Sequence, residues 1–342
     1  MRLGVLTGGG DCPGLNAAIR AVVRRGVRTH GIEFVGFEDG WRGVVDDRCE
    51  PLGVPETRGI LPRGGTILGS SGLDPYRVED GRDLVISTLE HHGLDGLIAI
   101  GGEGTLRAAA RLSGDGVRIV GIPKTIDNDV AGTDVTIGFQ TAAQIASDAV
   151  DRLHTTAESH DRVMIVEVMG RHAGWIALSA GTAGGADAIL IPEQPFDIDR
   201  VCEHLLHRHE NRSSFSIVVV AEGATPIEGT LELPVPPLDD NGFPRLGGLA
   251  TDLAPEIEKR TGFQTRVTIL GHVQRGGTPV AFDRVLATRY GIAAADLAVG
   301  GGWGRMVARD GQDVVDVPLS VVAGERNLVP PHLYEEAEVF FG

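Results

Sequence analysis

The sequence has few cysteines, few aromatic residues and no long apolar run, and each shortage excludes a class of protein. Its three cysteines, Cys12, Cys49 and Cys202, are widely spaced, so neither a disulfide framework nor a zinc site is expected. No apolar run reaches the roughly 20 residues that a membrane helix needs. The opening MRLGVLTGGG lacks the basic and apolar regions of a secretory signal. The expected location is the cytoplasm, with no membrane partner.

Positive charge is also scarce, and lysine is the scarcest part of it. The chain has 31 basic and 47 acidic residues, a formal net charge of −16, which argues against nucleic acids as partners. Only two of the basic residues are lysines, Lys124 and Lys259. A phosphate ligand would therefore need a local group of arginines.

Glycine, in contrast, is abundant and follows no period. It accounts for 49 of 342 residues, about twice the usual ~7%, which favours tight turns and close approach of the backbone to a ligand. The length favours two domains or one large α/β body.

Short β-branched runs alternate with helix-like stretches along the whole chain. The predicted strands are 3–7, 34–37, 96–100, 118–122, 164–169, 188–191, 215–221 and 266–270. The predicted helices are 15–31, 81–93, 105–113, 141–157, 174–181, 197–210, 250–262 and 284–301. This order predicts largely parallel sheets covered on both faces, with ligands bound beyond the carboxyl ends of the strands. The Pro-rich, acidic segment 225–248 is expected to be a surface excursion.

Two of the predicted strands end in glycine-rich turns that open a helix. GGGDCPG (8–14) and GGEGT (101–105) offer backbone N–H groups and the positive helix end to a phosphate. A purely structural turn explains the first equally well. Glu103 in the second turn would repel phosphate unless a cation such as Mg²⁺ lay between them, although a carboxylate is also an ordinary first-turn helix residue.

A third strand ends in PKTIDND (123–129), which combines several chemically active side chains. Asp127 could take a proton from a hydroxyl group, and Thr125 could bind a phosphate or hydroxyl. Lys124 could neutralise a transferring phosphoryl group. The alternative is an Asp/Asn-rich turn that bonds its own backbone.

Four arginines lie at the ends or starts of other predicted strands. Arg171 in MGRHAG (169–174) and Arg275 in HVQRGG (272–277) lie beside glycines after a strand, and Arg162 and Arg266 lie at the start of one. Guanidinium groups suit phosphate oxygens, although any one of them alone is more typical of a surface arginine. For His272, core packing is as reasonable as a ligand role.

Together these motifs resemble the 6-phosphofructokinase family over nearly the whole chain. The matching segments occur in the family's order: GVLTGGGDCPGLNAAIR, RGGTILGSS, IGGEGT, PKTIDNDV, GTDVTIGFQTA, VEVMGRHAG and LGHVQRGGTPVAFDR. The resemblance implies two Rossmann-like α/β domains, each of three layers with a mainly parallel sheet, and an active site in the cleft between them. The larger, nucleotide-binding domain would comprise 1–139 and 252–302, and the smaller, fructose 6-phosphate-binding domain 140–251 and 303–342. The implied reaction transfers a phosphoryl group to the C1 hydroxyl of fructose 6-phosphate in glycolysis.

The resemblance also implies roles for individual residues around the phosphoryl donor. The donor loops would contain Gly10, Gly102, Glu103, Gly104 and Thr105, with Glu103 on Mg²⁺. Asp127 would be the general base, flanked by Thr125 and Ile126 at the sugar phosphate.

The implied sugar-phosphate site draws on later segments. Its residues are Met169, Gly170, Arg171, Glu222, His272, Val273, Gln274 and Arg275. Arg171 would also face the transferring phosphoryl group, and His272 and Arg275 would bind the 6-phosphate. Arg162 and Arg266 would enter from a neighbouring subunit, which implies a homo-oligomer, either a tetramer or a dimer.

Two positions bear on the identity of the phosphoryl donor, and they favour different donors. Gly104 resembles ATP-dependent enzymes, whereas Lys124 resembles pyrophosphate-dependent ones. An aspartate at position 104 would occupy the space of the α-phosphate and nucleoside, so the glycine favours ATP, as in the actinobacterial-type ATP-dependent branch. A pyrophosphate-dependent enzyme, a non-catalytic paralogue and a nucleotide-binding dehydrogenase are the alternatives, although the spaced dehydrogenase fingerprint is missing.

Two departures from the family pattern concern arginines. Gly72 and Leu73 stand where many ATP enzymes have an arginine and an aromatic residue, and Arg77 is a possible substitute. At the family's regulatory pocket Arg25 is present, but the neighbouring positions are Ala21, His154 and Ser213. Regulation by ADP or phosphoenolpyruvate at that pocket is therefore not expected.

Overall fold

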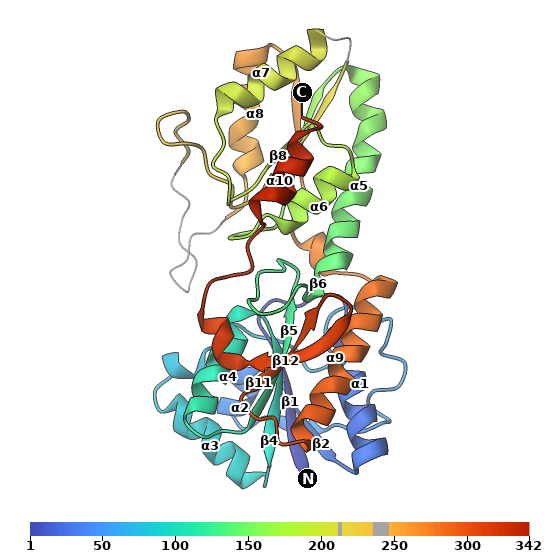
Figure 1. Cartoon of the computed structure of the whole chain (residues 1–342), viewed down its shortest axis with the longest axis vertical. Helices are drawn as coiled ribbons and strands as arrows, with labels where there is room; N and C mark the ends of the chain where they lie inside the picture. The colour runs from blue at the N-terminus through green and yellow to red at the C-terminus, as the bar shows by residue number, and fades with distance from the viewer. Residues whose placement is uncertain (211–213, 235–245, 342) are drawn as a thin grey trace. The chain divides into compact units, whose positions relative to one another are not determined.

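The computed structural model describes residues 1–210, 214–234 and 246–341 (Figure 1). The chain divides into two compact units, and each is formed by two stretches of sequence. Unit 1 comprises Met1–Thr141 and Arg275–Asn327, and unit 2 comprises Ala142–Gln274 and Leu328–Gly342. Among the described residues, no helix is both long and apolar enough to cross a membrane.

Unit 1 is built on one mainly parallel sheet with the strand order β12-β11-β5-β4-β1-β2-β3. The short strand β6 pairs with β5 outside this order, and the edge pairs β2–β3 and β11–β12 are antiparallel. The strands are β1 (Arg2–Gly8), β2 (Glu33–Phe37), β3 (Cys49–Pro51), β4 (Gly96–Gly101), β5 (Ile119–Thr125), β6 (Ile137–Gly138), β11 (Arg305–Asp310) and β12 (Asp313–Pro318). Central strands β1 and β4 are almost wholly buried, as expected for a sheet covered on both faces.

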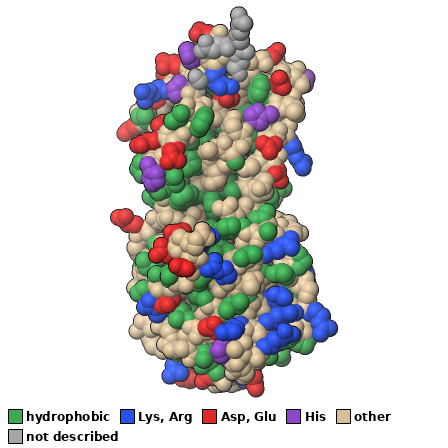
Figure 2. Space-filling view, turned by 45° about the vertical axis from the view of Figure 1, so that its right-hand side comes forward, with side chains coloured by type: hydrophobic (Ala, Val, Ile, Leu, Met, Phe, Trp, Pro, Cys, Tyr) green, Lys and Arg blue, Asp and Glu red, His purple; other side chains and the backbone are tan. Residues whose placement is uncertain are grey.

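Helices cover both faces of this sheet (Figure 1). They are α1 (Leu15–Arg25), α2 (Trp41–Val45), α3 (Gly81–His91), α4 (Glu103–Gly114) and α9 (Ala281–Val299). Helices α1 and α9 pack together on one face. On the other face α2, α3 and α4 enclose an apolar core that includes Phe37, Trp41 and Leu106. Figure 2 shows basic side chains gathered on part of unit 1. In the same unit desolvation lowers the pKa of Arg24, and the charges of Arg20, Arg28 and Arg58 lower it further.

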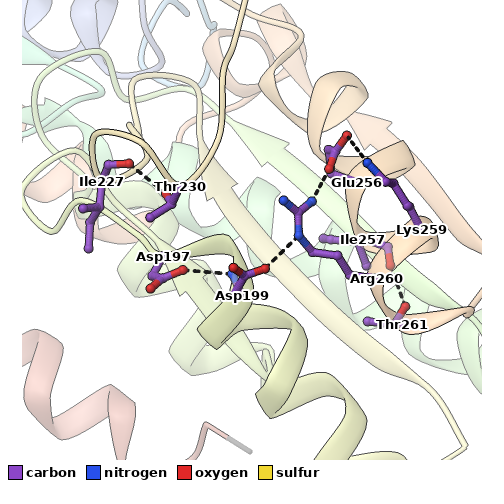
Figure 3. A network of polar contacts seen from close by, with 9 residues as sticks. All are labelled: Asp197, Asp199, Ile227, Thr230, Glu256, Ile257, Lys259, Arg260 and Thr261. Carbon is purple, nitrogen blue, oxygen red and sulfur yellow. Dashed lines mark hydrogen bonds and ion pairs between the residues drawn. The ribbon is translucent and has the colours of Figure 1, made fainter.

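Unit 2 contains a four-stranded, fully parallel sheet with the order β10-β7-β9-β8. Its strands are β7 (Val163–Val168), β8 (Ala188–Leu190), β9 (Ser216–Ala221) and β10 (Thr265–Ile269). Its helices are α5 (Phe139–His160, which begins in unit 1), α6 (Trp175–Ala183), α7 (Ile198–Glu210), α8 (Leu249–Thr261) and α10 (Pro331–Glu338). Arg260 of α8 joins α7 through Asp199, at 2.8 Å, and also contacts Glu256 (Figure 3).

The mixed α/β fold with mainly parallel sheets confirms the predicted class, and every predicted strand and helix is present with shifted ends. The division into units differs from the predicted domains at two places. Residues 252–274 belong to unit 2 because α8 packs against α7 and β10. Residues 303–327 belong to unit 1 because β11 extends the large sheet beside β5. In the predicted excursion 225–248, residues 235–245 lie outside the described residues.

Candidate functional site

A buried lysine forms hydrogen bonds with the backbone of the glycine-rich loop after β1. Lys124, on β5, is only 1% exposed, and its Nζ donates to the carbonyl oxygens of Gly8 at 2.8 Å and Gly10 at 2.5 Å. Burial lowers the pKa of this ammonium group. On the other side of the loop, a Cβ at Gly10 would lie 2.6 Å from the Arg275 guanidinium. Glycine at this position therefore lets Arg275 lie against the loop.

A polar cavity of about 630 Å³ opens beside this loop in unit 1. Its second wall is the segment 65–72, whose Ser71 carbonyl accepts a hydrogen bond from Gly9 N at 2.9 Å. Ser70 donates to the Gly9 carbonyl from the same side. The lining residues are Gly9, Gly10, Asp11, Gly65, Thr66, Gly69, Ser70, Ser71 and Gly72. Backbone groups and hydroxyls dominate this lining, a composition suited to phosphate oxygens.

The second glycine-rich turn leads from β4 into α4. Gly102 is the N-cap of the helix and Glu103 its first residue, so free N–H groups and the positive helix end face this turn. Thr105 is buried, because its side chain fills the space left by the missing Cβ atoms of Gly8 and Gly101. A Cβ added to Gly104 would meet nothing within 4 Å. Of these predicted donor residues, Thr105 serves packing and Gly104 faces open space.

Two arginines neutralise the Glu103 carboxylate. Arg107 contacts one oxygen from the next turn of α4, and Arg326 donates to the other through Nε at 3.2 Å and Nη2 at 2.9 Å. Arg326 Nε also lies 3.9 Å from Asp129 Oδ2. One guanidinium thus bridges the two carboxylates. No sequence pattern indicated Arg326, which is 223 residues away from Glu103.

The side chains at the end of β5 and in the turn that follows it differ in burial. Ile126 is fully buried, whereas Thr125 and Asp127 are half-buried. Thr125 Oγ1 accepts the Asp127 N–H at 3.1 Å. Asn128 adopts a left-handed conformation with φ 55°, which asparagine tolerates better than most residues. The predicted contact of Ile126 with substrate is therefore limited to its backbone.

The pKa of Asp129, in the same turn, is shifted well above its ordinary value. Burial, reinforced by the negative charge of Asp127, raises its pKa from 3.8 to about 6, against the opposing effect of Arg326. Asp129 therefore binds a proton more readily than an exposed aspartate does.

In unit 2 the predicted sugar-site residues follow the carboxyl ends of β7 and β9. Gln274, fully buried, accepts the Met169 N–H at 3.2 Å and donates to the Gly271 carbonyl at 3.0 Å. Its amide is thus used to position Met169. Gly170 (φ 143°) accepts the Gly223 N–H at 3.1 Å, which joins the loops that carry Arg171 and Glu222.

The other predicted sugar-site residues lie in different surroundings. Glu222 lines a cavity of about 200 Å³ in unit 2. His272 is exposed, and Val273 is 61% exposed. Arg275 belongs to unit 1, where its Nη1 lies 3.3 Å from the Asp11 carbonyl oxygen that accepts its hydrogen bond.

Arg162 and Arg266 lie at the other end of this sheet. Arg162 immediately precedes β7, and Arg266 pairs with Met164 near the amino end of that strand. The length of β7 separates them from Met169, about 20 Å along a strand of this length. Within unit 2, then, neither arginine reaches the loops that carry Arg171 and Glu222.

The expected regulatory arginine is engaged within the chain. Arg25 forms a two-pronged contact with Asp296, at 2.7 and 3.0 Å, and His30 contacts the same carboxylate. His154 is hydrogen-bonded to the Gly184 carbonyl at 2.5 Å. Ser213 lies outside the described residues.

Glycine loops, a cavity beside them and partly or fully buried carboxylates at the carboxyl edge of a parallel sheet are typical of an α/β enzyme that handles phosphates. The comparison with known proteins makes this specific: the chain belongs to the phosphofructokinase family, which matches residues 2–298. It is 57% identical, over the full length of both chains, to the pyrophosphate–fructose 6-phosphate 1-phosphotransferase of Amycolatopsis methanolica. It is 54% identical, again over both full lengths, to the ATP-dependent 6-phosphofructokinase of Mycobacterium tuberculosis.

A solved structure supports the same assignment. The phosphofructokinase of Saccharomyces cerevisiae superposes with a TM-score of 0.80 at 34% identity, over 94% of this chain and 45% of the yeast chain. The chain is thus an enzyme of the phosphofructokinase class, with relatives named for two different phosphoryl donors.

The two lysines of the chain provide a matched test of the hydrogen bonds that Lys124 forms with the glycine-rich loop. Lys124→Met should lower the free energy of unfolding by about 2 kcal/mol, because the buried Gly8 carbonyl and the part-buried Gly10 carbonyl lose their donor. It should also lower kcat/KM for the donor about tenfold or more, since the loop is no longer fixed. Lys259→Met is the control, because Lys259 is 76% exposed and 4.0 Å from Glu256; Figure 3 draws the contact between these two side chains. Equal urea midpoints for the two variants would contradict the supporting role of Lys124.

Asp129 predicts a pH-dependent contribution to stability. The ordinary pKa of its carboxyl group is 3.8, and the pKa in the folded protein is about 6. The contribution of Asp129 to the free energy of unfolding is therefore fully present below pH 4 and is lost as the pH rises through 6. Asp129→Asn should therefore be more stable than the parent at pH 7, by at most about 3 kcal/mol, and should lose that advantage below pH 4. Thermal unfolding of both proteins from pH 4 to 7 measures this difference, and a pH-independent difference would refute it.

Proposed function

We propose that the chain is an ATP-dependent 6-phosphofructokinase, which phosphorylates the C1 hydroxyl of fructose 6-phosphate as a cytoplasmic enzyme of glycolysis. The observation that carries ATP as donor is the open space at Gly104, where an added Cβ would meet nothing within 4 Å. Beside the donor loop this space is available to the α-phosphate and the nucleoside. The polar cavity next to Gly10 supports binding of phosphates by the neighbouring loop.

In this proposal Asp127 is the general base. Its half-buried side chain lies just beyond β5, which ends at the half-buried Thr125. Asp127 accepts the proton of the sugar hydroxyl as the oxygen attacks, and Thr125 Oγ1 fixes the turn through the Asp127 N–H. Lys124 acts from behind the loop, where it holds the carbonyls of Gly8 and Gly10 away from the donor phosphates. The phosphates then meet N–H groups instead of carbonyl oxygens.

The residues around Glu103 fit a magnesium ion, which the proposed reaction requires. Glu103 and Asp129 are hard oxygen donors close enough to share the guanidinium of Arg326, and Mg²⁺ prefers such ligands. A bound Mg²⁺ would neutralise charge on the donor oxygens. Arg326 would leave Glu103 when the ion is held, and its charge then remains available beside the donor.

We further propose that unit 2 recognises the sugar phosphate through Met169, Gly170, Arg171, Glu222 and His272, with Gln274 positioning Met169 and Val273 exposed beside it. Arg275, in unit 1, would bind the 6-phosphate. The placement of Arg162 and Arg266 at the amino edge of the unit 2 sheet supports a role in a neighbouring subunit. The active form would then be a homo-oligomer, a tetramer or a dimer.

Pyrophosphate is the second candidate donor, favoured by the 57% identity to an enzyme named for it. Purified enzyme with fructose 6-phosphate and Mg²⁺ should turn over with ATP and at least tenfold less efficiently with pyrophosphate. The opposite order would replace ATP by pyrophosphate in the proposal.

Gly104→Asp tests the space argument for ATP directly. The aspartate would place charge and bulk in the proposed nucleoside space, so kcat/KM for ATP should fall about 10²-fold or more. Gly114→Asp is the matched control, because a Cβ there also meets nothing within 4 Å at the far end of the same helix. If both variants keep their ATP activity, the argument from Gly104 fails.

Asp127→Ala should lower kcat about 10²–10⁴-fold, as expected when a general base is removed. Arg162→Ala should be defective in sugar binding. Hybrid oligomers formed from these two variants should regain activity, to about a quarter of the parent value at random pairing, because some sites then receive both intact residues. No gain over the separate variants after mixed refolding would rule out the contribution of Arg162 across subunits.

A further inference from the structure

Unit 1 contains a second polar cluster, built by the turn after α2 and the end of α3. Asp47 Oδ2 lies 2.9 Å from His91 Nδ1, and Asp47 Oδ1 lies 2.5 Å from His92 Nε2. Cys49 Sγ lies 3.6 Å from the same His92 nitrogen. His92 precedes the amino end of β4, whereas Glu103 follows its carboxyl end. The cluster therefore belongs to a different part of unit 1 from the donor loops.

The local backbone brings these side chains to one point. Neighbouring residues of a helix do not face each other, yet His91 and His92 reach one carboxylate by using different ring nitrogens, and their rings stack with centroids 4.8 Å apart. Asp47 adopts a left-handed conformation, φ 54°. Arg2 Nη1 fixes the other side by donating to the His92 carbonyl at 2.6 Å.

These donors form a set that borderline divalent cations prefer. The carboxylate and imidazole atoms of Asp47, His91 and His92 all lie within 4.8 Å of one another, and in the described part of the chain they are the one such group of three. Cys49 is not in that group, although its Sγ lies 3.6 Å from His92 Nε2; it would add a fourth, sulfur ligand by moving toward the other two side chains. Tetrahedral Zn²⁺ holds its ligand atoms about 3.5 Å apart, so shifts of about 1 Å would convert the hydrogen bonds into coordination.

We propose that Asp47, His91 and His92, with Cys49 as the fourth ligand, form a binding site for Zn²⁺ or a cation of similar chemistry. Two imidazoles, a carboxylate and a thiolate select Zn²⁺ or Co²⁺ over Mg²⁺, which prefers oxygen ligands. The site is separate from the magnesium position proposed at Glu103 and would stabilise unit 1 by clamping the α2 turn to α3.

The charges facing the cluster also favour a cation. The negative end of α3 points at the two histidines, and Asp47 and Glu50 both act on Cys49 with negative charge. Arg2 is the positive group that faces Cys49. Arg48, between Asp47 and Cys49 in sequence, forms ion pairs with Glu38, Asp39 and Asp46.

Cobalt titration of the full-length protein, stripped of metals with EDTA, tests this proposal without any substrate. One equivalent of Co²⁺ should produce the intense visible absorption of tetrahedral coordination, together with the near-ultraviolet band of a thiolate ligand, and Zn²⁺ should abolish both. His91→Ala should weaken the affinity at least tenfold, and it should fold because His91 is 70% exposed. Cys49→Ser should remove the thiolate band.

Three controls separate this site from others. Glu90→Ala, next to His91 on α3, and His332→Ala, an exposed histidine elsewhere, should both keep the cobalt spectrum. Glu103→Gln should keep it as well, because the donor site offers oxygen ligands only. Zn²⁺ should raise the melting temperature of the parent but not of His91→Ala. A spectrum without tetrahedral bands, or bands retained in His91→Ala, would reduce the cluster to hydrogen bonding alone and overturn the proposal.

Discussion

The donor side of unit 1 depends on one buried ammonium group. A charge as fully enclosed as that of Lys124 is costly unless hydrogen-bonded acceptors surround it. The fold provides these acceptors as the Gly8 and Gly10 carbonyls, so a single side chain of β5 ties both ends of this turn. In a chain with so few lysines, the residue serves a place where the planar, bulkier guanidinium of arginine would not match two carbonyls on a tight loop.

The same region balances an excess of negative charge. Arg107 and Arg326 compensate for the carboxylate of Glu103, and Arg326 also lies 3.9 Å from that of Asp129. This arrangement explains how an acidic protein can accept phosphates: the counter-charges are local and arise from distant parts of the sequence. Burial, together with the charge of Asp127, still raises the pKa of Asp129, because Arg326 opposes these effects only from 3.9 Å.

Much of this could be predicted from sequence because the signals are local. Buried β-branched runs that end at glycine or proline indicated the parallel strands, and the short motifs at their ends indicated the loops that carry Glu103, Asp127 and Arg171. Contacts between distant segments left no such signal. Arg326 meets Glu103 through tertiary folding alone, and β12 was missed because its exposed, acidic residues form no apolar run. Motif matching also said nothing about whether a side chain faces inward, as those of Ile126 and Gln274 do.

The chain returns from unit 1 to unit 2 between Asn327 and Leu328, and hydrogen bonds hold it on both sides of this crossing. Asn327 donates to the carbonyls of Asn128 at 2.8 Å and Asp129 at 3.1 Å. Two residues later, Val329 N donates to Glu193, which also receives the Gly174 N–H in the loop that follows Arg171. The few residues between these contacts are therefore held at both ends, by hydrogen bonds within unit 1 on one side and within unit 2 on the other. A segment this short, with both ends fixed, gives the C-terminal crossing of the chain little slack of its own.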